Sequence, residues 1–296
     1  MGRIFPYLRW IISRIFRKFY RLFVSIFLSP LPIRVQIAKI AIAVNPMLKY
    51  STKVKWDAVE RPAYSYGMLN AANLAKALGI NEISAIEFGT ASGAGLVAME
   101  KAARLIYRET GVRIEVYGFD SMTGLPETRD YKDQIYFWPP GLFNVTSDKF
   151  LKKLKVTKIV IGNVSATTHS FIEIYKPAKI GFISFDLDYY SSTKESLGIF
   201  GFDELEYLPR VECYLDDTGS FELLSASSHT GVLAAISEFN TKSQNRKILK
   251  KEDVGRLRKL PGNWFQASYV AHFFNHDQYN TSVFNDSQQK KLHGQF

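Results

Sequence analysis

The hydrophobic positions of the chain change their pattern near residue 57. Before it, apolar residues recur every three or four positions, whereas after it short apolar runs alternate with segments of helical period. Short apolar runs bounded by turn residues indicate buried strands, and the periodic segments indicate helices. The repeated strand–helix alternation predicts an α/β fold with a doubly wound, mostly parallel sheet.

The expected elements can be placed along the chain by residue number. Strands are predicted over residues 83–88, 113–119, 158–161, 180–185 and 211–215. Helices are predicted over residues 71–78, 94–108, 165–175, 193–206 and 231–239. Residues 246–250 and 267–274 are predicted to add a hairpin at the sheet edge. The loop over residues 124–146 is long enough to be a lid.

A basic leader precedes this alternation. Residues 1–56 contain 11 Lys or Arg and no acidic residue, which leaves 27 basic and 28 acidic residues in the rest of the chain. Over residues 1–29 the apolar side chains fall on one half of a helical wheel and the arginines and lysine on the other. We therefore divide the chain into a basic amphipathic segment, residues 1–56, and a globular domain, residues 57–296.

The leader is predicted to bind a membrane surface. Arginines interrupt every long apolar run, which disfavours a spanning helix, and a basic face opposite Phe and Ile suits a helix lying in the interface. Residues 33–44 extend this apolar, weakly basic character. Three alternatives stay open: packing on the domain or in a homo-oligomer, an organellar transit peptide, and a nucleic-acid arm. The single cysteine, Cys213, is compatible with a reducing compartment, and we expect a cytoplasmic protein at the membrane face.

Candidate ligand residues follow the first two predicted strands. In such sheets, ligands bind beyond the carboxyl ends of the strands. The first strand ends in Glu87 and the loop GTASGAG, which carries Gly89, Gly93 and Gly95 and leads into a helix. The second strand ends in Asp120, where a carboxylate suits a ribose diol. These residues are expected to bracket an adenosine-like ligand, with a tight turn and a loop cap as the alternative roles.

Four carboxylates follow the fourth and fifth predicted strands. They are Asp186, Asp188, Asp216 and Asp217. Side by side they would repel one another unless a cation neutralised them, and all-oxygen ligation suits Mg²⁺ or Ca²⁺. Strand alternation would put residues 186 and 188 on one face. The alternative is that Asp188 caps a helix and Asp217 starts a turn.

These motifs together carry a family resemblance. The segments IEFGTASGAG, GFDSMTGLPE, FDLDYYSST and YLDD resemble the macrocin O-methyltransferase family, class I enzymes of Rossmann-like fold that use S-adenosylmethionine. By that resemblance, the cofactor-binding residues are Glu87, Gly89, Gly93, Gly95, Asp120, Ser121 and Asn163. Asp186, Asp216 and Asp217 would bind Mg²⁺, and Asp188 would be the general base. The chain departs from the family pattern at Ala91 and Tyr189.

The resemblance implies a function for the domain. It is expected to be a Mg²⁺-dependent O-methyltransferase that methylates a hydroxyl of a sugar, glycan or glycolipid. A non-catalytic, membrane-associated scaffold that retains the fold is the alternative. No nucleic-acid partner is expected, because the domain's net charge of −1 indicates no basic groove. The acceptor itself is not identified by any motif.

Overall fold

A seven-stranded mixed sheet forms the centre of the molecule. The computed structural model describes residues 19–20, 33–144, 152, 154–220, 223–258 and 260–284. The strands are β1 (Glu82–Phe88), β2 (Arg113–Asp120), β3 (Lys158–Ile161), β4 (Ile180–Phe185), β5 (Tyr207–Leu215), β6 (Arg246–Lys250) and β7 (Ser268–Phe273). Their order across the sheet is β3-β2-β1-β4-β5-β7-β6. Strands β1 to β5 are parallel, and β7 runs antiparallel to both β5 and β6.

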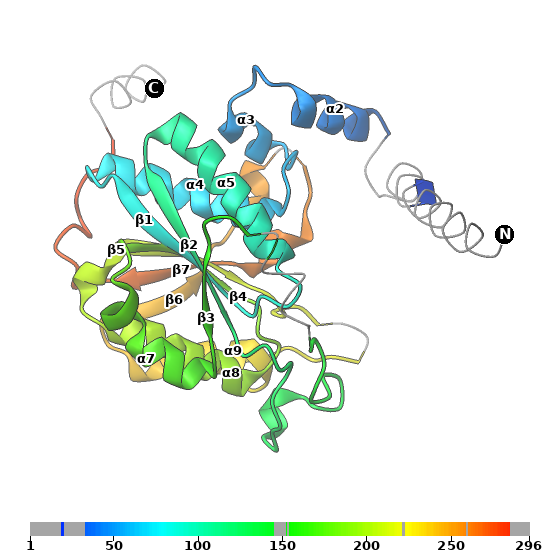
Figure 1. Ribbon diagram of the computed structural model, residues 1–296, viewed down its shortest axis with the longest axis vertical. Helices are drawn as coiled ribbons and strands as arrows, with labels where there is room; N and C mark the ends of the chain where they lie inside the picture. Colours follow the sequence, from blue (N-terminus) through cyan, green and yellow to red (C-terminus); the bar gives the residue numbers. More distant parts are fainter. Residues whose placement is uncertain are drawn as a thin grey trace.

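Helices cover both faces of the sheet (Figure 1). The helices α4 (Pro62–Ala77) and α5 (Ala94–Thr110) pack on one face, around Met68, Ile106 and Phe182. The helices α7 (Val164–Tyr175), α8 (Tyr190–Ser196) and α9 (Gly231–Lys242) pack on the other face, around Phe171, Phe185 and Phe200. This layering confirms the predicted doubly wound, Rossmann-like class, and the β6–β7 hairpin confirms the predicted edge pair.

The central strand β4 shows why the apolar runs were reliable predictors. All six of its residues are buried, because helices cover the sheet above and below it. The neighbouring strand β5 begins at Tyr207, four residues before the predicted start at residue 211. The extension was not predicted because proline, present at position 209, is disfavoured inside a strand. The pairing of β4 with β5 is irregular between Ile180 and Phe182, and this irregularity accommodates the proline.

Two helices differ from their predicted bounds. The predicted helix over residues 193–206 starts earlier, as α8, and stops at Ser196, after which the chain forms short 3-10 turns over Leu197–Gly201 and Glu204–Glu206. Glycines at positions 198 and 201 explain this break, since glycine disfavours a continued helix. Helix α4 begins at Pro62, nine residues before the predicted start, because a proline is well tolerated in the first turn.

The predicted leader helix over residues 1–29 lies outside the described residues, apart from positions 19 and 20. Beyond it, α2 (Ile33–Val44) has the bounds of the predicted apolar stretch and ends before Asn45-Pro46. The next helix, α3 (Tyr50–Lys55), contributes buried Tyr50 and Val54 to the core, so packing of the domain begins before residue 57. Within the described ranges, no helix combines the length and apolar character needed to cross a membrane.

Candidate functional site

A cavity of about 640 Å³ lies at the carboxyl ends of the parallel strands. Its lining includes Gly89, Asp120, Ser121, Asn163, Asp186 and Asp188. It therefore joins the glycine loop after β1 to the acidic residues after β4, as expected for this type of sheet. The other predicted site residues do not line this cavity; these are Glu87, Gly93, Gly95, Asp216 and Asp217.

The glycine loop is shaped by close backbone approaches. Gly89 has a φ of +79°, and a Cβ placed there would lie 1.8 Å from the carbonyl oxygen of Asp186. A Cβ on Gly95 would lie 1.8 Å from the carboxylate of Glu87. Glycine is thus required at both positions by the folded chain itself, since any side chain would collide. Gly93, at a φ of +71°, forms the N-cap of α5.

Asp120 organises this loop from the end of β2. Its Oδ2 accepts hydrogen bonds from the backbone N–H of Thr90 (2.8 Å), the hydroxyl of Thr90 (3.0 Å) and the backbone N–H of Ala91 (3.0 Å). Its Oδ1 accepts the backbone N–H of Met122 at 2.7 Å. Asp120 therefore acts as a loop cap that also lines the cavity, and Oδ1 retains capacity for a further donor.

This double role makes the effect of Asp120→Ala specific. Removal of the carboxylate leaves three backbone N–H groups without their acceptor, so we expect a loss of about 2–4 kcal/mol in the free energy of unfolding. The measurement is urea denaturation followed by circular dichroism. An unchanged midpoint would show that the loop does not depend on Asp120, contrary to the hydrogen bonds described above.

Ser121 and Asn163 also have structural roles at the cavity wall. The side-chain oxygen of Asn163 accepts the backbone N–H and the hydroxyl of Ser165, at 2.9 and 2.8 Å, which caps the start of α7. The hydroxyl of Ser121 accepts hydrogen bonds from Thr123. Both residues are thereby held against the cavity in fixed orientations.

Glu87 is a buried carboxyl beneath the glycine loop. Its Oε1 accepts the hydroxyl of Tyr64 at 2.8 Å, and Oε2 has no hydrogen-bond partner within the described part of the chain. Burial raises the pKa of Glu87 to about 7, against the opposing effects of the Tyr64 hydroxyl and the Arg61 charge. Tyr64 and Arg61 lie at the start of α4, far from any motif, and sequence analysis missed both.

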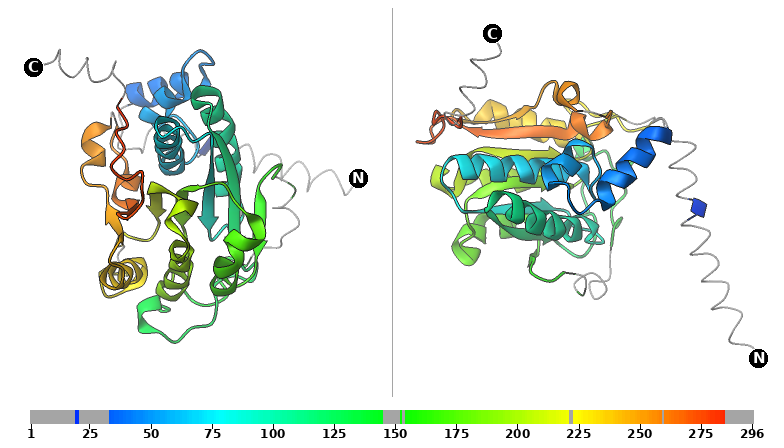
Figure 2. Two further views of the ribbon diagram at one scale, coloured as in Figure 1. Left: turned by 90° about the vertical axis from the view of Figure 1, so that its left-hand side faces the viewer. Right: turned by 90° about the horizontal axis from the view of Figure 1, so that it is seen from above.

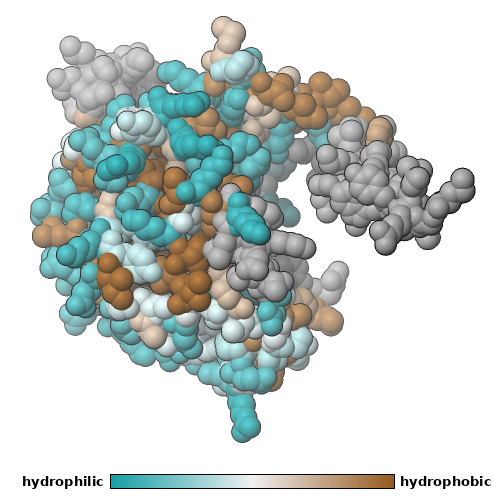
Figure 3. All heavy atoms as spheres, viewed as in Figure 1, coloured by the Kyte–Doolittle hydropathy of each residue, from teal (hydrophilic) through white to brown (hydrophobic). Residues whose placement is uncertain are grey.

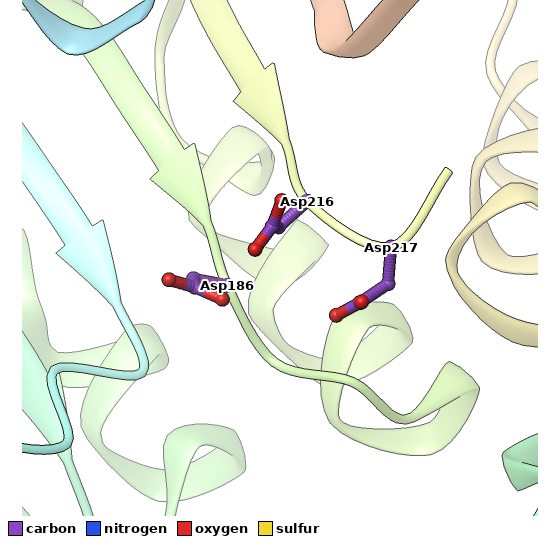
Figure 4. Close-up of side chains that lie close together, drawn as sticks. All are labelled: Asp186, Asp216 and Asp217. Atoms are coloured by element: carbon purple, nitrogen blue, oxygen red, sulfur yellow. The ribbon is translucent and has the colours of Figure 1, made fainter. Parts of the chain in front are cut away.

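The acidic residues after β4 and β5 converge (Figure 4). Carboxylate oxygens of Asp186, Asp216 and Asp217 lie within 4.8 Å of one another. The hydroxyl of Tyr214 donates to Oδ1 of Asp216 at 2.9 Å, which fixes the orientation of that carboxylate. The structure therefore brings together the three residues predicted as metal ligands, because β4 and β5 are adjacent parallel strands that end at the same edge.

Asp188 lies beside these three carboxylates, but the backbone conformation that places it there differs from the predicted one. Strand β4 ends at Phe185, so strand alternation does not place residues 186 and 188 on one face, and that expectation was wrong. Instead Asp188 has a φ of +57°, a left-handed conformation, and its carboxyl group hydrogen-bonds to that of Asp217. The turned backbone brings the fourth carboxyl group to the cluster.

The electrostatics of the cluster favour a bound cation. Burial, followed by the charges of Asp216 and Glu87, raises the pKa of Asp186 well above its ordinary value. Burial and the charge of Asp188 likewise raise the pKa of Asp217, and burial and Asp186 raise that of Asp188. A divalent cation would relieve this repulsion, and three converging carboxylates form the all-oxygen donor set that Mg²⁺ and Ca²⁺ prefer.

The loop predicted as a lid is anchored over its described part. The buried carboxylate of Asp133 accepts the backbone N–H of Ser191 at 2.7 Å and the hydroxyls of Ser191 and Thr128 at 2.9 and 2.5 Å. It thereby holds the loop to the first turn of α8, whose Ser191 lines the cavity. The hydroxyl of Tyr189 donates to the carbonyl of Trp138 at 2.7 Å. Sequence analysis missed Asp133, although an acid in a long loop is a typical cap for a neighbouring helix.

Comparison with known proteins gives weak similarities. No protein-family model and no curated protein sequence matches the chain. Among solved structures, it is similar to the calicheamicin methyltransferase CalS11, at 16% identity over 87% of this chain and 91% of that chain, with a TM-score of 0.45. It is also similar to the O-methyltransferase NovP, at 14% identity over 71% of this chain and 80% of that chain, with a TM-score of 0.46. A third similar structure is a putative class I S-adenosylmethionine-dependent methyltransferase from Listeria monocytogenes. The identity is 12% over 88% of this chain and 76% of that chain, and the TM-score is 0.33. Values this low assign no activity to the chain, and its fold class rests on the observed sheet.

Proposed function

We propose that this protein is an S-adenosylmethionine-dependent O-methyltransferase that requires Mg²⁺ and methylates a hydroxyl of a sugar, glycan or glycolipid. The observation that carries the proposal is the single cavity that joins the glycine loop to the acidic cluster. Its volume of about 640 Å³ is typical of a small-molecule site, for which roughly 300–1,000 Å³ is usual. One cavity can thus hold a cofactor and a reacting hydroxyl in contact.

The cofactor would occupy the end of the cavity beside β1 and β2. There, Oδ1 of Asp120 can accept a ribose hydroxyl, and Gly89 and Ala91 of the loop before α5 line the cavity. Asn163 and Ser121 line the same end. Glu87 and Tyr64 support this region from beneath the loop, through the buried hydrogen bond between them.

The reacting hydroxyl would occupy the end beside Asp186 and Asp188. Asp186, Asp216 and Asp217 would hold the metal ion, whose charge would lower the pKa of an acceptor hydroxyl. Asp188 would accept the hydroxyl proton, since burial raises its pKa toward neutrality, where a general base works best. Asp217 would hold the metal ion next to Asp188, because the two carboxyl groups lie in contact.

One wall of the cavity favours a sugar-like acceptor. Residues 123–128 and Phe143 form this wall, with Phe143 and Leu125 giving an apolar surface and Glu127 a carboxylate. A sugar ring has apolar faces and polar edges, so it suits a site that combines an aromatic side chain with hydrogen-bonding groups. Ser191 and Glu195 of α8 also line the cavity and can take part in hydrogen bonding to ring hydroxyls.

Calorimetric titration tests the proposed cofactor. We expect the purified full-length protein to bind S-adenosylmethionine and S-adenosylhomocysteine with micromolar dissociation constants. Asp120→Ala should weaken binding by roughly tenfold to a thousandfold when measured well below its unfolding temperature, because charge-assisted hydrogen bonds to the ribose are lost. Absence of binding by a folded sample would reject the proposal and favour the scaffold.

A further inference from the structure

The helix α2 carries an exposed apolar stripe. Ile33, Ile37, Ile40 and Val44 are spaced four, three and four residues apart, which places them on one helix face. All four are exposed, with 62% of Ile37 and 73% of Val44 accessible to solvent, and α2 contributes no buried residue to the core. Figure 3 shows α2 as a hydrophobic projection beside the body of the molecule. We call these four residues the α2 stripe.

The α2 stripe points away from the rest of the domain. On the opposite side of the helix, Val35, Ala38 and Ile42 are partly covered. The ammonium group of Lys53 in α3 donates a hydrogen bond to the carbonyl of Ala43 at 2.8 Å, which links α2 to the folded core. The most apolar face of the helix is therefore the face that the domain leaves open, the reverse of an ordinary surface helix.

The charges carried by α2 and α3 themselves have one sign. Arg34 and Lys39 flank the α2 stripe on either side of the helix, and further lysines follow at positions 49, 53 and 55. Residues 1–56 contain no acidic residue at all. A second copy of the chain docked through the same stripe would bring like charges together, which disfavours a symmetric dimer. An anionic surface complements both the cations and the apolar side chains.

We propose that the α2 stripe docks the protein on an anionic lipid bilayer, with α2 lying in the plane of the interface. The four apolar side chains enter the boundary between headgroups and acyl chains, and Arg34 and Lys39 contact lipid phosphates. The proposal goes beyond methyl transfer and does not depend on it. It gives a structural basis to the membrane contact predicted for the leader, whose own residues 1–18 and 21–29 lie outside the described residues.

The position of α2 relates this docking face to the candidate site. Helix α4 starts beside the carboxyl ends of β1 and β4, since Tyr64 near its first turn contacts Glu87 at the end of β1. The right-hand view of Figure 2 shows α2, the blue helix next to α3 and α4, at this same end of the molecule. Docking through the α2 stripe therefore brings the end of the sheet that bears the cavity toward the bilayer. If the proposed function holds, the acceptor hydroxyl belongs to a lipid-linked glycan.

Vesicle sedimentation with two matched variants of the full-length protein tests the docking. Ile37→Glu places a charge in the α2 stripe, whereas Ile174→Glu makes the same change at a similarly exposed isoleucine, 66% accessible, on α7. On phosphatidylcholine vesicles that contain phosphatidylserine, we expect Ile37→Glu to weaken partitioning about tenfold and Ile174→Glu to leave it unchanged. Wild-type binding should fall as salt is raised, and should be weak on phosphatidylcholine alone.

Three results would overturn this proposal. One is wild-type protein that stays in the supernatant with the phosphatidylserine vesicles. Another is equal partitioning of wild type, Ile37→Glu and Ile174→Glu, which would leave α2 without a role in binding. The third is a dimer, seen by light scattering without lipid, that Ile37→Glu dissociates, since a second copy would then cover the stripe. Because none of these measurements involves the cofactor or the metal, failure here is separate from failure of the proposed function.

Discussion

Asp188→Asn is expected to lower the rate of methyl transfer by about 10²–10⁴-fold, the range for loss of a general base. Asparagine keeps the size of the side chain and tolerates the left-handed backbone at this position, where φ is +57°. It also preserves a hydrogen bond to Asp217, so the cluster should stay assembled. Affinities for S-adenosylmethionine and Mg²⁺, measured by calorimetry, should therefore change by no more than a few fold.

The matched control is Asp216→Asn, the same substitution at a proposed metal ligand. It removes one of three converging carboxylates, so Mg²⁺ affinity should fall and excess Mg²⁺ should restore part of the rate. Excess Mg²⁺ should not restore Asp188→Asn. If Asp188→Asn instead loses Mg²⁺ affinity and recovers at high Mg²⁺, Asp188 is a ligand rather than the base, and the proton must leave through another group.

The sheet could be predicted from sequence because its central strands are buried on both faces. Strand β4 has its predicted bounds, because an apolar segment interrupted only by Gly181 and Ser184 is typical of a strand covered on both faces. The edge strand β3 also has its predicted bounds, although only Val160 in it is buried. Parallel strands also place their carboxyl ends at one edge, so residues that follow different strands meet without further assumptions. This rule was sufficient to predict that Asp186, Asp216 and Asp217 lie close together.

Contacts made by helix α4 could not be predicted in the same way. The hydrogen bond between Tyr64 and Glu87 joins residues on different elements, and its geometry depends on how α4 packs across the sheet. The first half of α4, residues 62–70, contains Gly, Ser, Asn and Tyr, whose helix propensities are modest. Tertiary packing of Tyr64 and Met68, both fully buried, stabilises this half.

For Asp120 and Asn163, the local hydrogen bonds show a structural role that residue type alone could not establish. Asp120 was predicted to hold a ribose, with a loop cap as the alternative, and the structure places it as a cap whose carboxylate still faces the cavity. A short acidic side chain after a strand suits both roles, so residue type cannot separate them. The same holds for Asn163, which caps α7 from the cavity wall.

Glu87→Gln is expected to change how stability depends on pH. Burial raises the folded-state pKa of Glu87 from 4.5 to about 7. Below pH 4.5 the carboxyl is neutral in both states, so it has no effect on the pH dependence there. As pH rises from 4.5 to 7, the unfolded chain loses the proton first and stability falls, by on the order of 3 kcal/mol in total. Glutamine stays neutral, so the variant should lack this loss.

The measurement is urea denaturation of both proteins, in EDTA, at pH 5 and pH 8. The free energy of unfolding of Glu87→Gln, relative to wild type, should be more favourable at pH 8 than at pH 5 by about 1–3 kcal/mol. The difference reports Glu87 together with its effect on Asp186, because the charge of Glu87 contributes to the raised pKa of Asp186. A relative stability that is the same at both pH values would mean that Glu87 is already ionised at pH 5.

Glu100→Gln, in α5, provides the opposite case. Glu100 is also buried, but its Oε1 accepts the backbone N–H groups of Lys155, Val156 and Thr157 at 2.8–2.9 Å, and these bonds outweigh burial and lower its pKa. A lowered pKa adds stability above pH 4.5 that is lost only as pH falls further. Glu100→Gln should thus destabilise the protein equally at pH 5 and pH 8. Two identical substitutions of buried glutamates would then differ because the Glu100 carboxylate is surrounded by donors, whereas Oε2 of Glu87 has no hydrogen-bond partner among the residues that the structure describes.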